Sequence, residues 1–222
     1  MSRAIDTFLR SINLRMDVGH AERFAHFRPT GKSAQVTDAI ARGVPSAASM
    51  VVAAYGSGKS IAAGAGALLV ENAPEAETVI QTLAQRFQQC EPTVAAFAEE
   101  RLASGSRGAA IVLEGAQEDP VAALRAAAEG RLGQLSLGQS ASTTDPLPVL
   151  RAIVQAANDQ GVDRIALIWD EFGRHLEALA SSGRPEELSL VQQIAEWAAR
   201  QDAPAATFTL LMHQNFFHYA GA

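Results

Sequence analysis

Residues Ala48 to Ser60 read A-S-M-V-V-A-A-Y-G-S-G-K-S, an apolar run followed by a glycine-bearing loop that ends in Lys59 and Ser60. This order predicts a strand that passes through a loop into a helix. Backbone N–H groups of such a loop can point inward at a phosphate, because no side chains obstruct them. We therefore expect Lys59 to reach the β- and γ-phosphates of a nucleotide and the Ser60 hydroxyl to bind Mg²⁺.

The loop departs at one position from the phosphate-loop pattern G-x-x-x-x-G-K-[ST], because Ala53 stands where the first glycine is expected. Gly56 partly compensates, since it frees the middle of the loop, where positive φ is otherwise costly. An ordinary glycine turn between a strand and a helix is the alternative. We favour nucleotide binding, with these loop residues as candidates: Tyr55, Gly56, Ser57, Gly58, Lys59, Ser60 and Ile61.

A second G-K-S, at Gly31 to Ser33, serves as an internal comparison. No apolar strand precedes it, and His26 occupies the place of the first glycine, so we reject it as a phosphate loop. The chain has 18 lysines and arginines, but its only lysines are Lys32 and Lys59. In a chain so rich in arginine, a lysine at the end of a glycine loop suggests a need for a compact point charge.

The 222 residues are 48% hydrophobic and 19% charged, which suffices for one α/β domain with a full core. We divide this single domain into an N-terminal helical segment, 1–46, and a core, 47–222. A net charge of −6 argues against attraction of nucleic acid to the whole surface, although a local basic groove stays possible. The single cysteine, Cys90, and the lack of a long apolar stretch predict a cytoplasmic protein with no membrane partner.

Apolar strands alternate with helical patterns along the chain, which predicts a parallel sheet covered by helices on both faces, a three-layer α/β/α sandwich. Further strands are expected at Ala109–Leu113, Arg164–Trp169 and Ala206–Met212. Helices are expected over 61–70, between 75 and 103, over 119–129 and 147–157, around 175–179, and over 186–200.

Asp170 and Glu171 follow directly on the second long apolar strand, at the edge of a parallel sheet where ligands bind. A carboxylate at this position can hold Mg²⁺, and its neighbour can polarise the water that attacks the γ-phosphate. We assign Asp170 to the metal and Glu171 to the catalytic base. The alternative is an acidic pair favoured by the dipole of a following helix. Arg174 and His175, just beyond the pair, are expected on an exposed helix.

Three polar residues, His213, Gln214 and Asn215, stand at the end of the last strand. A polar group at that position could sense the γ-phosphate or share the attacking water. Gln214 is the first choice for this role and Asn215 the second, while a solvated turn is an equally good interpretation.

Taken in this order, these three motifs make the chain resemble the additional-strand, catalytic-glutamate class of P-loop NTPases, which includes AAA+, STAND and RecA-like ATPases. Ala53–Ser60 would be its Walker A motif and Ile165–Glu171 its Walker B motif. The sensor strand, Thr207–Gln214, would then lie between the other two. The phrases Y-G-S-G-K-S, D-E-F-G-R-H-L-E and L-M-H-Q-N-F also look like the large ATPases of bacterial anti-phage defence islands.

The resemblance implies ATP and Mg²⁺ as cofactors, and hydrolysis that drives conformational change in a larger bacterial assembly, in phage defence or a DNA-related process. Its partners would be copies of itself or other subunits. Arg28, in the segment before the core, would lie near the adenine. Such a core would continue to a fifth strand, so we expect an N-terminal part of a longer ATPase. A module that holds ATP with little hydrolysis is the alternative function. A small-molecule kinase or a Rossmann dehydrogenase fits less well.

Overall fold

The structure, a computed structural model, describes residues 12–137, 145–182 and 188–214. Its four strands form one parallel sheet in the order β1-β4-β3-β2. They are β1 (Ala48–Val52), β2 (Arg107–Glu114), β3 (Val162–Asp170) and β4 (Ala205–Met212). The expected α/β fold with a parallel sheet is confirmed, and β4 lies between β1 and β3, as the expected strand order requires.

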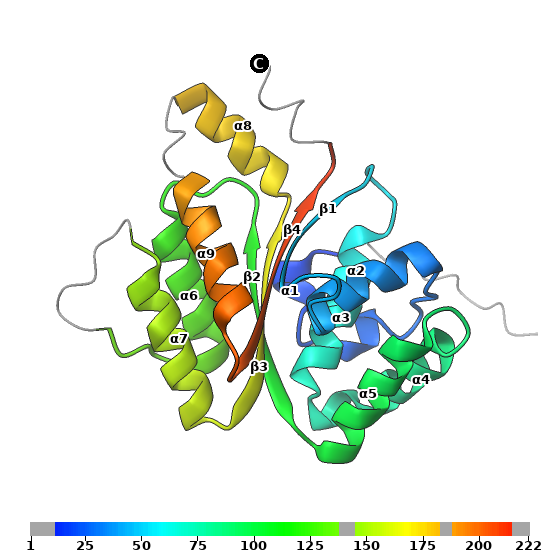
Figure 1. Cartoon of the computed structure of the whole chain (residues 1–222). Helices are drawn as coiled ribbons and strands as arrows, with labels where there is room; N and C mark the ends of the chain where they lie inside the picture. The colour runs from blue at the N-terminus through cyan, green and yellow to red at the C-terminus, as the bar shows by residue number, and fades with distance from the viewer. Residues whose placement is uncertain (1–11, 138–144, 183–187, 215–222) are drawn as a thin grey trace, which may run out of the picture.

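Helices cover both faces of the sheet, so the molecule has three layers (Figure 1). α1 to α5 lie on one face, α6, α7 and α9 on the other, and α8 extends beyond one end of the strands. The helices in the described residues are α1 (Leu14–Asp17), α2 (Gly31–Ala41), α3 (Lys59–Glu71), α4 (Glu77–Phe87), α5 (Pro92–Ser104), α6 (Pro120–Leu132), α7 (Leu147–Asp159), α8 (Phe172–Ser182) and α9 (Leu188–Arg200), with 3₁₀ turns η1 (Ala21–Arg23) and η2 (Pro74–Ala76).

The two central strands are buried on both faces because their side chains alternate between two apolar clusters. In β3, Ala166 and Ile168 point into the core beneath α3, whereas Ile165, Leu167 and Trp169 point into the core beneath α6, α7 and α9. Period-two alternation explains why a strand with apolar residues at every position is stable here.

β1 is different, because it forms an edge of the sheet and is paired only with β4 among the described strands. Met50 and Val52 remain 46% and 45% exposed, while Val51 packs against the core beneath α3. An apolar run in the sequence looks the same in a central strand and in an edge strand, so this position had to come from the tertiary structure.

Two glycines of α3 allow other segments to pack closely against this helix. A Cβ at Gly64 would lie 2.1 Å from Cε1 of Phe24, and one at Gly66 would lie 2.9 Å from Cβ of Ile40 in α2. The close approach is thus to the N-terminal segment, which covers the outer side of α3. This places the glycine-rich helix between the sheet and residues that precede β1.

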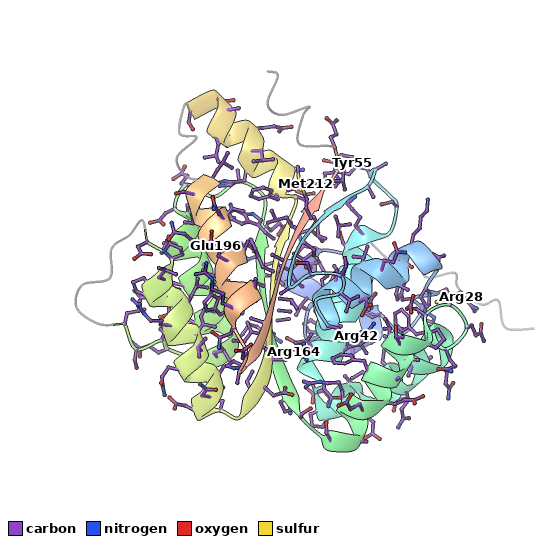
Figure 2. All side chains as sticks on the ribbon, viewed as in Figure 1. Arg28, Arg42, Tyr55, Arg164, Glu196 and Met212 are labelled. Carbon is purple, nitrogen blue, oxygen red and sulfur yellow. The ribbon has the colours of Figure 1, made fainter. Side chains whose placement is uncertain are left out.

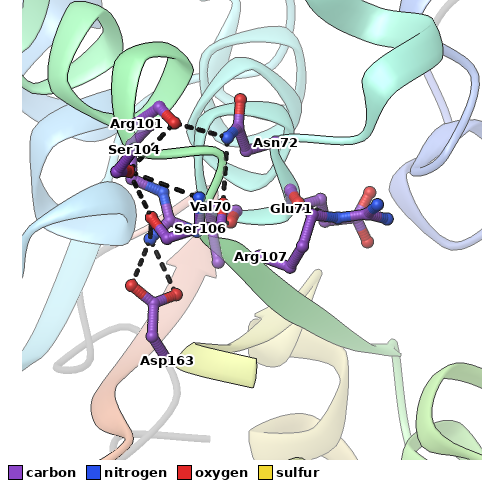
Figure 3. Close-up of polar contacts among 8 residues, drawn as sticks. All are labelled: Val70, Glu71, Asn72, Arg101, Ser104, Ser106, Arg107 and Asp163. Carbon is purple, nitrogen blue, oxygen red and sulfur yellow. Dashed lines mark hydrogen bonds and ion pairs between the residues drawn. The ribbon is translucent and has the colours of Figure 1, made fainter. Parts of the chain in front are cut away.

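A buried arginine ties together the ends of four elements at the amino-terminal edge of the sheet (Figure 3). Arg101 of α5 is 3% exposed and binds both carboxylate oxygens of Asp163 at 2.7 and 2.6 Å. It also donates to the Val70 carbonyl at 2.6 Å and to the Ser106 hydroxyl at 2.9 Å. The Asn72 amide completes the network by donating to the carbonyls of Arg101 and Ser106. The network anchors the edge opposite the strand ends that carry the polar motifs.

The described residues contain no helix that is both long and apolar enough to cross a membrane. Cys90 is a half-buried free thiol, and burial raises its pKa. A thiol with a raised pKa is a weak nucleophile at neutral pH, so we assign no chemistry to it.

Candidate active site

The carboxyl ends of β1, β3 and β4 bring the three polar motifs of the sequence to one edge of the sheet. Tyr55 and Met212 lie at this end and Arg164 lies toward the other (Figure 2). The parallel direction of all strands is the physical reason, since every carboxyl end then faces the same way.

The Ser60 hydroxyl, at the start of α3, donates a hydrogen bond to Oδ2 of Asp170 at 3.1 Å. Two oxygen ligands at adjacent corners of a magnesium octahedron lie about 3 Å apart, because each sits about 2.1 Å from the ion. This pair therefore fits the two protein ligands that the sequence predicted. Burial raises the pKa of Asp170, and the hydrogen bonds from Glu171 N–H and Ser60 oppose that rise.

Glu171 adopts a left-handed backbone conformation, with φ of +52°. Only Asn72 shares this feature among the described non-glycine residues. Oε2 of Glu171 lies 3.0 Å from Nε of Arg174, and the side chain keeps 24% exposure. A strained residue with a partly exposed carboxylate, directly after a buried metal-type ligand, is typical of a functional position.

The ammonium group of Lys59 is buried and has three acceptors around it. Nζ donates to the carbonyl oxygens of Ala53 at 2.6 Å and Ala54 at 2.9 Å, and lies 3.2 Å from Nδ1 of His213. Burial lowers the pKa of Lys59, while Asp170 and Glu171 oppose this change. In this arrangement the lysine points at its own loop, so its predicted contact with phosphates requires a movement of the side chain.

His213 occupies the place that the sequence prediction gave to Gln214. Besides Lys59, His213 approaches Glu171, with Nε2 3.9 Å from Oε1. Gln214 is exposed, and Asn215 lies outside the described residues. Strand alternation could have revealed this, because Leu211 faces the core beneath α3 and the residue two positions later faces the same side.

Tyr55 covers His213 from the loop side. The two rings are stacked, with centroids 3.4 Å apart and an angle of 21° between their planes. The ring of Tyr55 also lies 5.9 Å from Nζ of Lys59, and Tyr55 itself is 67% exposed. The predicted loop residue Tyr55 is thus in contact with the end of β4.

The remaining loop residues form a helix entry that is suited to an anion. Gly56 and Gly58 have φ values of +73° and +84°. Gly58 is the N-cap of α3, and no side chain accepts a hydrogen bond from the first N–H groups of this helix. The first helical hydrogen bond runs from Ala62 N–H to the Gly58 carbonyl. The N–H groups of Lys59, Ser60 and Ile61 therefore precede the helical ladder and can serve as donors.

The N-terminal candidate Arg28 is exposed and lies in the helical layer, far from Tyr55 in the glycine loop (Figure 2). Its neighbours have structural roles. Phe27 is buried against Phe87, and Thr30 caps α2 together with Ser33 in a capping box. Ser33 belongs to the second G-K-S, so in this copy the serine stabilises a helix start.

The expectation that His175 lies on an exposed helix is wrong. The ring is 1% exposed and packs against Trp169 and Phe172, with ring centroids 4.7 and 5.7 Å apart. Its Nδ1 accepts a hydrogen bond from Gln117 N–H at 3.3 Å. α8 begins directly after β3, and its first turn places His175 against Trp169 at the end of that strand, so His175 supports the segment that carries Glu171. Arg174 remains largely exposed, as expected.

Two cavities, of about 450 and 400 Å³, lie along the outer edge of β2. Arg131 lines both and forms an ion pair with Glu71 between them. Gln117 lines the larger cavity near the carboxyl end of the strand. Neither cavity includes the glycine loop, where the side chain of Lys59 lies against the loop carbonyls.

The geometry defines an α/β protein with a polar site at the carboxyl edge of a parallel sheet. No protein-family model, curated protein or solved structure matches the chain. Within the described residues, no three His, Cys, Asp or Glu side chains are grouped so that they could hold a metal. A magnesium ion here would take Ser60 and Asp170 from the protein and its other ligands from phosphate oxygens and water.

Proposed function

We propose that this chain binds ATP with Mg²⁺ and hydrolyses it to ADP and phosphate. Ser60 and Asp170 hold the metal, and the N–H groups from Gly58 to Ile61 bind the phosphates with the ammonium of Lys59. Glu171 accepts a proton from the attacking water. The magnesium ion, once bound, neutralises charge on the β- and γ-phosphates.

The hydrogen bond between Ser60 and Asp170 carries the proposal. It joins the end of the glycine loop to the end of β3 across 110 residues, with the spacing that two magnesium ligands need. Glu171 stands next to this pair in a left-handed conformation that a glutamate adopts only at a cost. Neither observation is needed to stabilise an ordinary turn.

Isothermal titration calorimetry of ATP in the presence of Mg²⁺ tests the binding step. We expect Lys59→Ala to weaken binding by at least tenfold, because a charge-assisted contact to phosphate contributes about 1.5–3 kcal/mol. Lys32→Ala is the matched control, since Lys32 lies in the second G-K-S, where Ser33 is engaged in the capping box. Equal affinity of Lys59→Ala and the parent protein would contradict the assigned site.

A steady-state phosphate-release assay tests the chemical step. Glu171→Gln keeps the size of the side chain but cannot accept the proton, so we expect bound ATP without turnover. Turnover of the isolated chain should be slow if the reaction needs an arginine from a neighbouring subunit, which can contribute about 10³–10⁵ in rate.

A nucleotide-gated module that holds ATP with little hydrolysis is the second candidate. The capture of Lys59 by the Ala53 and Ala54 carbonyls favours it, because a loop that binds its own lysine is not preorganised for catalysis. Sustained phosphate release that is abolished in Glu171→Gln would exclude this function.

In either case the nucleotide would act within a larger bacterial assembly, through self-association or other subunits. The net charge of −6 gives no support to a nucleic-acid partner. Size-exclusion chromatography with light scattering, with and without ATP, would show whether the nucleotide changes the oligomeric state.

A further inference from the structure

All three N–H groups of the Lys59 ammonium already have an acceptor. A lysine ammonium has three N–H donors and no acceptor. Three acceptors surround Nζ of Lys59: two loop carbonyls and Nδ1 of His213. A phosphate oxygen can therefore gain a hydrogen bond from Lys59 only if one of these three acceptors leaves.

His213 is the acceptor that a phosphate can displace most readily. Its contact is the longest of the three at 3.2 Å, against 2.6 and 2.9 Å for the carbonyls. It is also the only one that comes from outside the loop. Because Lys59 can only donate, Nδ1 must carry a lone pair, which puts the ring proton of a neutral His213 on Nε2, facing Oε1 of Glu171 at 3.9 Å.

Burial and the nearby charges favour the neutral form of the imidazole. Burial lowers the pKa of His213, and the nearby Lys59 and Arg174 lower it further, while Glu171 opposes them. The ring is therefore neutral at neutral pH and can serve as an acceptor for the lysine.

Tyr55 holds the imidazole in this place. Stacking at 3.4 Å leaves little freedom for the ring of His213, whose side chain is only 13% exposed. The contact joins the middle of the glycine loop to the end of β4. A movement of the loop toward a phosphate must then either carry Tyr55 off His213 or pull Lys59 away from Nδ1.

We propose that Tyr55 and His213 are positioning residues that form a latch on Lys59, and that nucleotide phosphates bind by taking the place of His213 on the ammonium group. The latch lowers the affinity for ATP, because phosphate binding must first break the contact between His213 and Lys59. This inference rests on the proposed function, because it assumes that the phosphates reach Lys59.

The sequence offers a direct spectroscopic test, because the chain has only two lysines. Selective ¹³Cε-lysine labelling of the full chain gives two NMR signals, with the exposed Lys32 as an internal reference. Without nucleotide, we expect the Lys59 signal to differ from that of Lys32 and to shift in His213→Phe, which keeps an aromatic ring but removes the acceptor. A Lys59 signal that is unchanged in His213→Phe would overturn the latch.

Binding of a fluorescent ATP analogue measures the cost of the latch. A hydrogen bond from a charged ammonium is worth about 1.5–3 kcal/mol, so we expect His213→Phe to bind ATP more tightly than the parent, by about tenfold or more. Tyr55→Ala should bind more tightly as well, whereas Tyr55→Phe keeps the stack and should bind less tightly than Tyr55→Ala. Met16→Gln is the control for loss of an exposed apolar side chain, since Met16 is 65% exposed and Tyr55 67%.

The outcomes separate the latch from the proposed function. Weaker ATP binding by His213→Phe, comparable to that of Lys59→Ala, would show that His213 assists the phosphates and would overturn the latch. If the Lys59 signal shifts in His213→Phe but no variant binds ATP, the contact between His213 and Lys59 stands, whereas displacement by nucleotide and the proposed function are both refuted.

Discussion

The Ser60 hydroxyl and the Asp170 carboxylate lie 3.1 Å apart, although 110 positions separate them in the chain. The contact exists because β3 and the strand before the glycine loop run parallel, with β4 between them. It brings together two oxygen ligands from two distant motifs, so ATP binding should depend on Mg²⁺ through both residues.

Ser60→Ala should remove most of the effect of Mg²⁺ on ATP binding. The substitution deletes one of two protein oxygens near the ion, so we expect the gain in affinity on adding Mg²⁺ to shrink by about tenfold or more. Titration calorimetry in magnesium and in EDTA measures the gain. Ser60→Thr, which keeps the hydroxyl, should retain it, and Ser33→Ala should not alter it. A full magnesium effect in Ser60→Ala would refute the metal assignment.

Asp170→Asn should stabilise the protein at neutral pH in the absence of nucleotide and metal. Burial raises the pKa of Asp170, so the folded state holds the proton more tightly than the unfolded state. Stability therefore falls as pH rises from the unfolded pKa through the raised folded pKa, and stays lower above it. Asparagine removes this cost and can still accept from Glu171 N–H and donate to Ser60.

Thermal unfolding of both proteins between pH 4 and pH 8 measures the effect. The advantage of Asp170→Asn should be largest near pH 7 and should narrow toward pH 4, where the parent becomes protonated. A lower melting temperature for the variant at pH 7 would show that the carboxylate is stabilised in the fold. Magnesium-dependent ATP binding by Asp170→Asn should be lost at pH 7, because the variant lacks the carboxylate ligand.

Glu171→Gly should stabilise the fold and abolish hydrolysis. The φ of +52° costs a glutamate about 1 kcal/mol, which glycine does not incur. Urea unfolding measures the gain. Asn72→Gly provides the contrast, because Asn72 shares the positive φ but its amide binds the carbonyls of Arg101 and Ser106. That variant should lose stability. A loss of stability in Glu171→Gly would mean that the contact with Arg174 outweighs the backbone strain.

Arg101→Met should destabilise the protein by about 3 kcal/mol without changing ATP affinity, because it removes several buried charge-assisted hydrogen bonds at the far edge of the sheet. Urea unfolding and ATP titration measure the two quantities. Arg125→Met is the matched control, since Arg125 forms only an exposed pair with Glu129, and should change stability by less than about 0.5 kcal/mol. A changed ATP affinity in Arg101→Met would indicate coupling between the two edges.

Gly64→Ala should destabilise the protein by about 1–3 kcal/mol, because the new methyl group would overlap the ring of Phe24. In Gly64→Ala with Phe24→Leu, the smaller side chain makes room. We expect the double variant to be more stable than the sum of the two single changes predicts, by about 1 kcal/mol in a double-mutant cycle. Strict additivity would show that α3 and the N-terminal segment adjust independently.

The site illustrates which relationships a linear pattern can predict. Lys59, Ser60, Asp170 and Glu171 could be placed at one edge because each follows an apolar strand, and strands linked by helices run parallel. Gln214 is exposed at the end of β4, whereas His213 contacts Lys59, an orientation that strand alternation could have indicated. The inward orientation of His175 was also missed, since it depends on contacts of the first turn of α8 with Trp169 and Gln117.

By itself the sequence determined the α/β class, the parallel sheet and the identity of the loop and acidic motifs, because strand and helix periodicities and glycine placement are local properties. Only the tertiary structure decided that β1 pairs with β4 alone among the described strands, that Gly64 lies against Phe24, and that Lys59 contacts His213, which stacks on Tyr55. These relationships join residues far apart in the chain, and packing selects them from alternatives that the sequence pattern leaves equivalent.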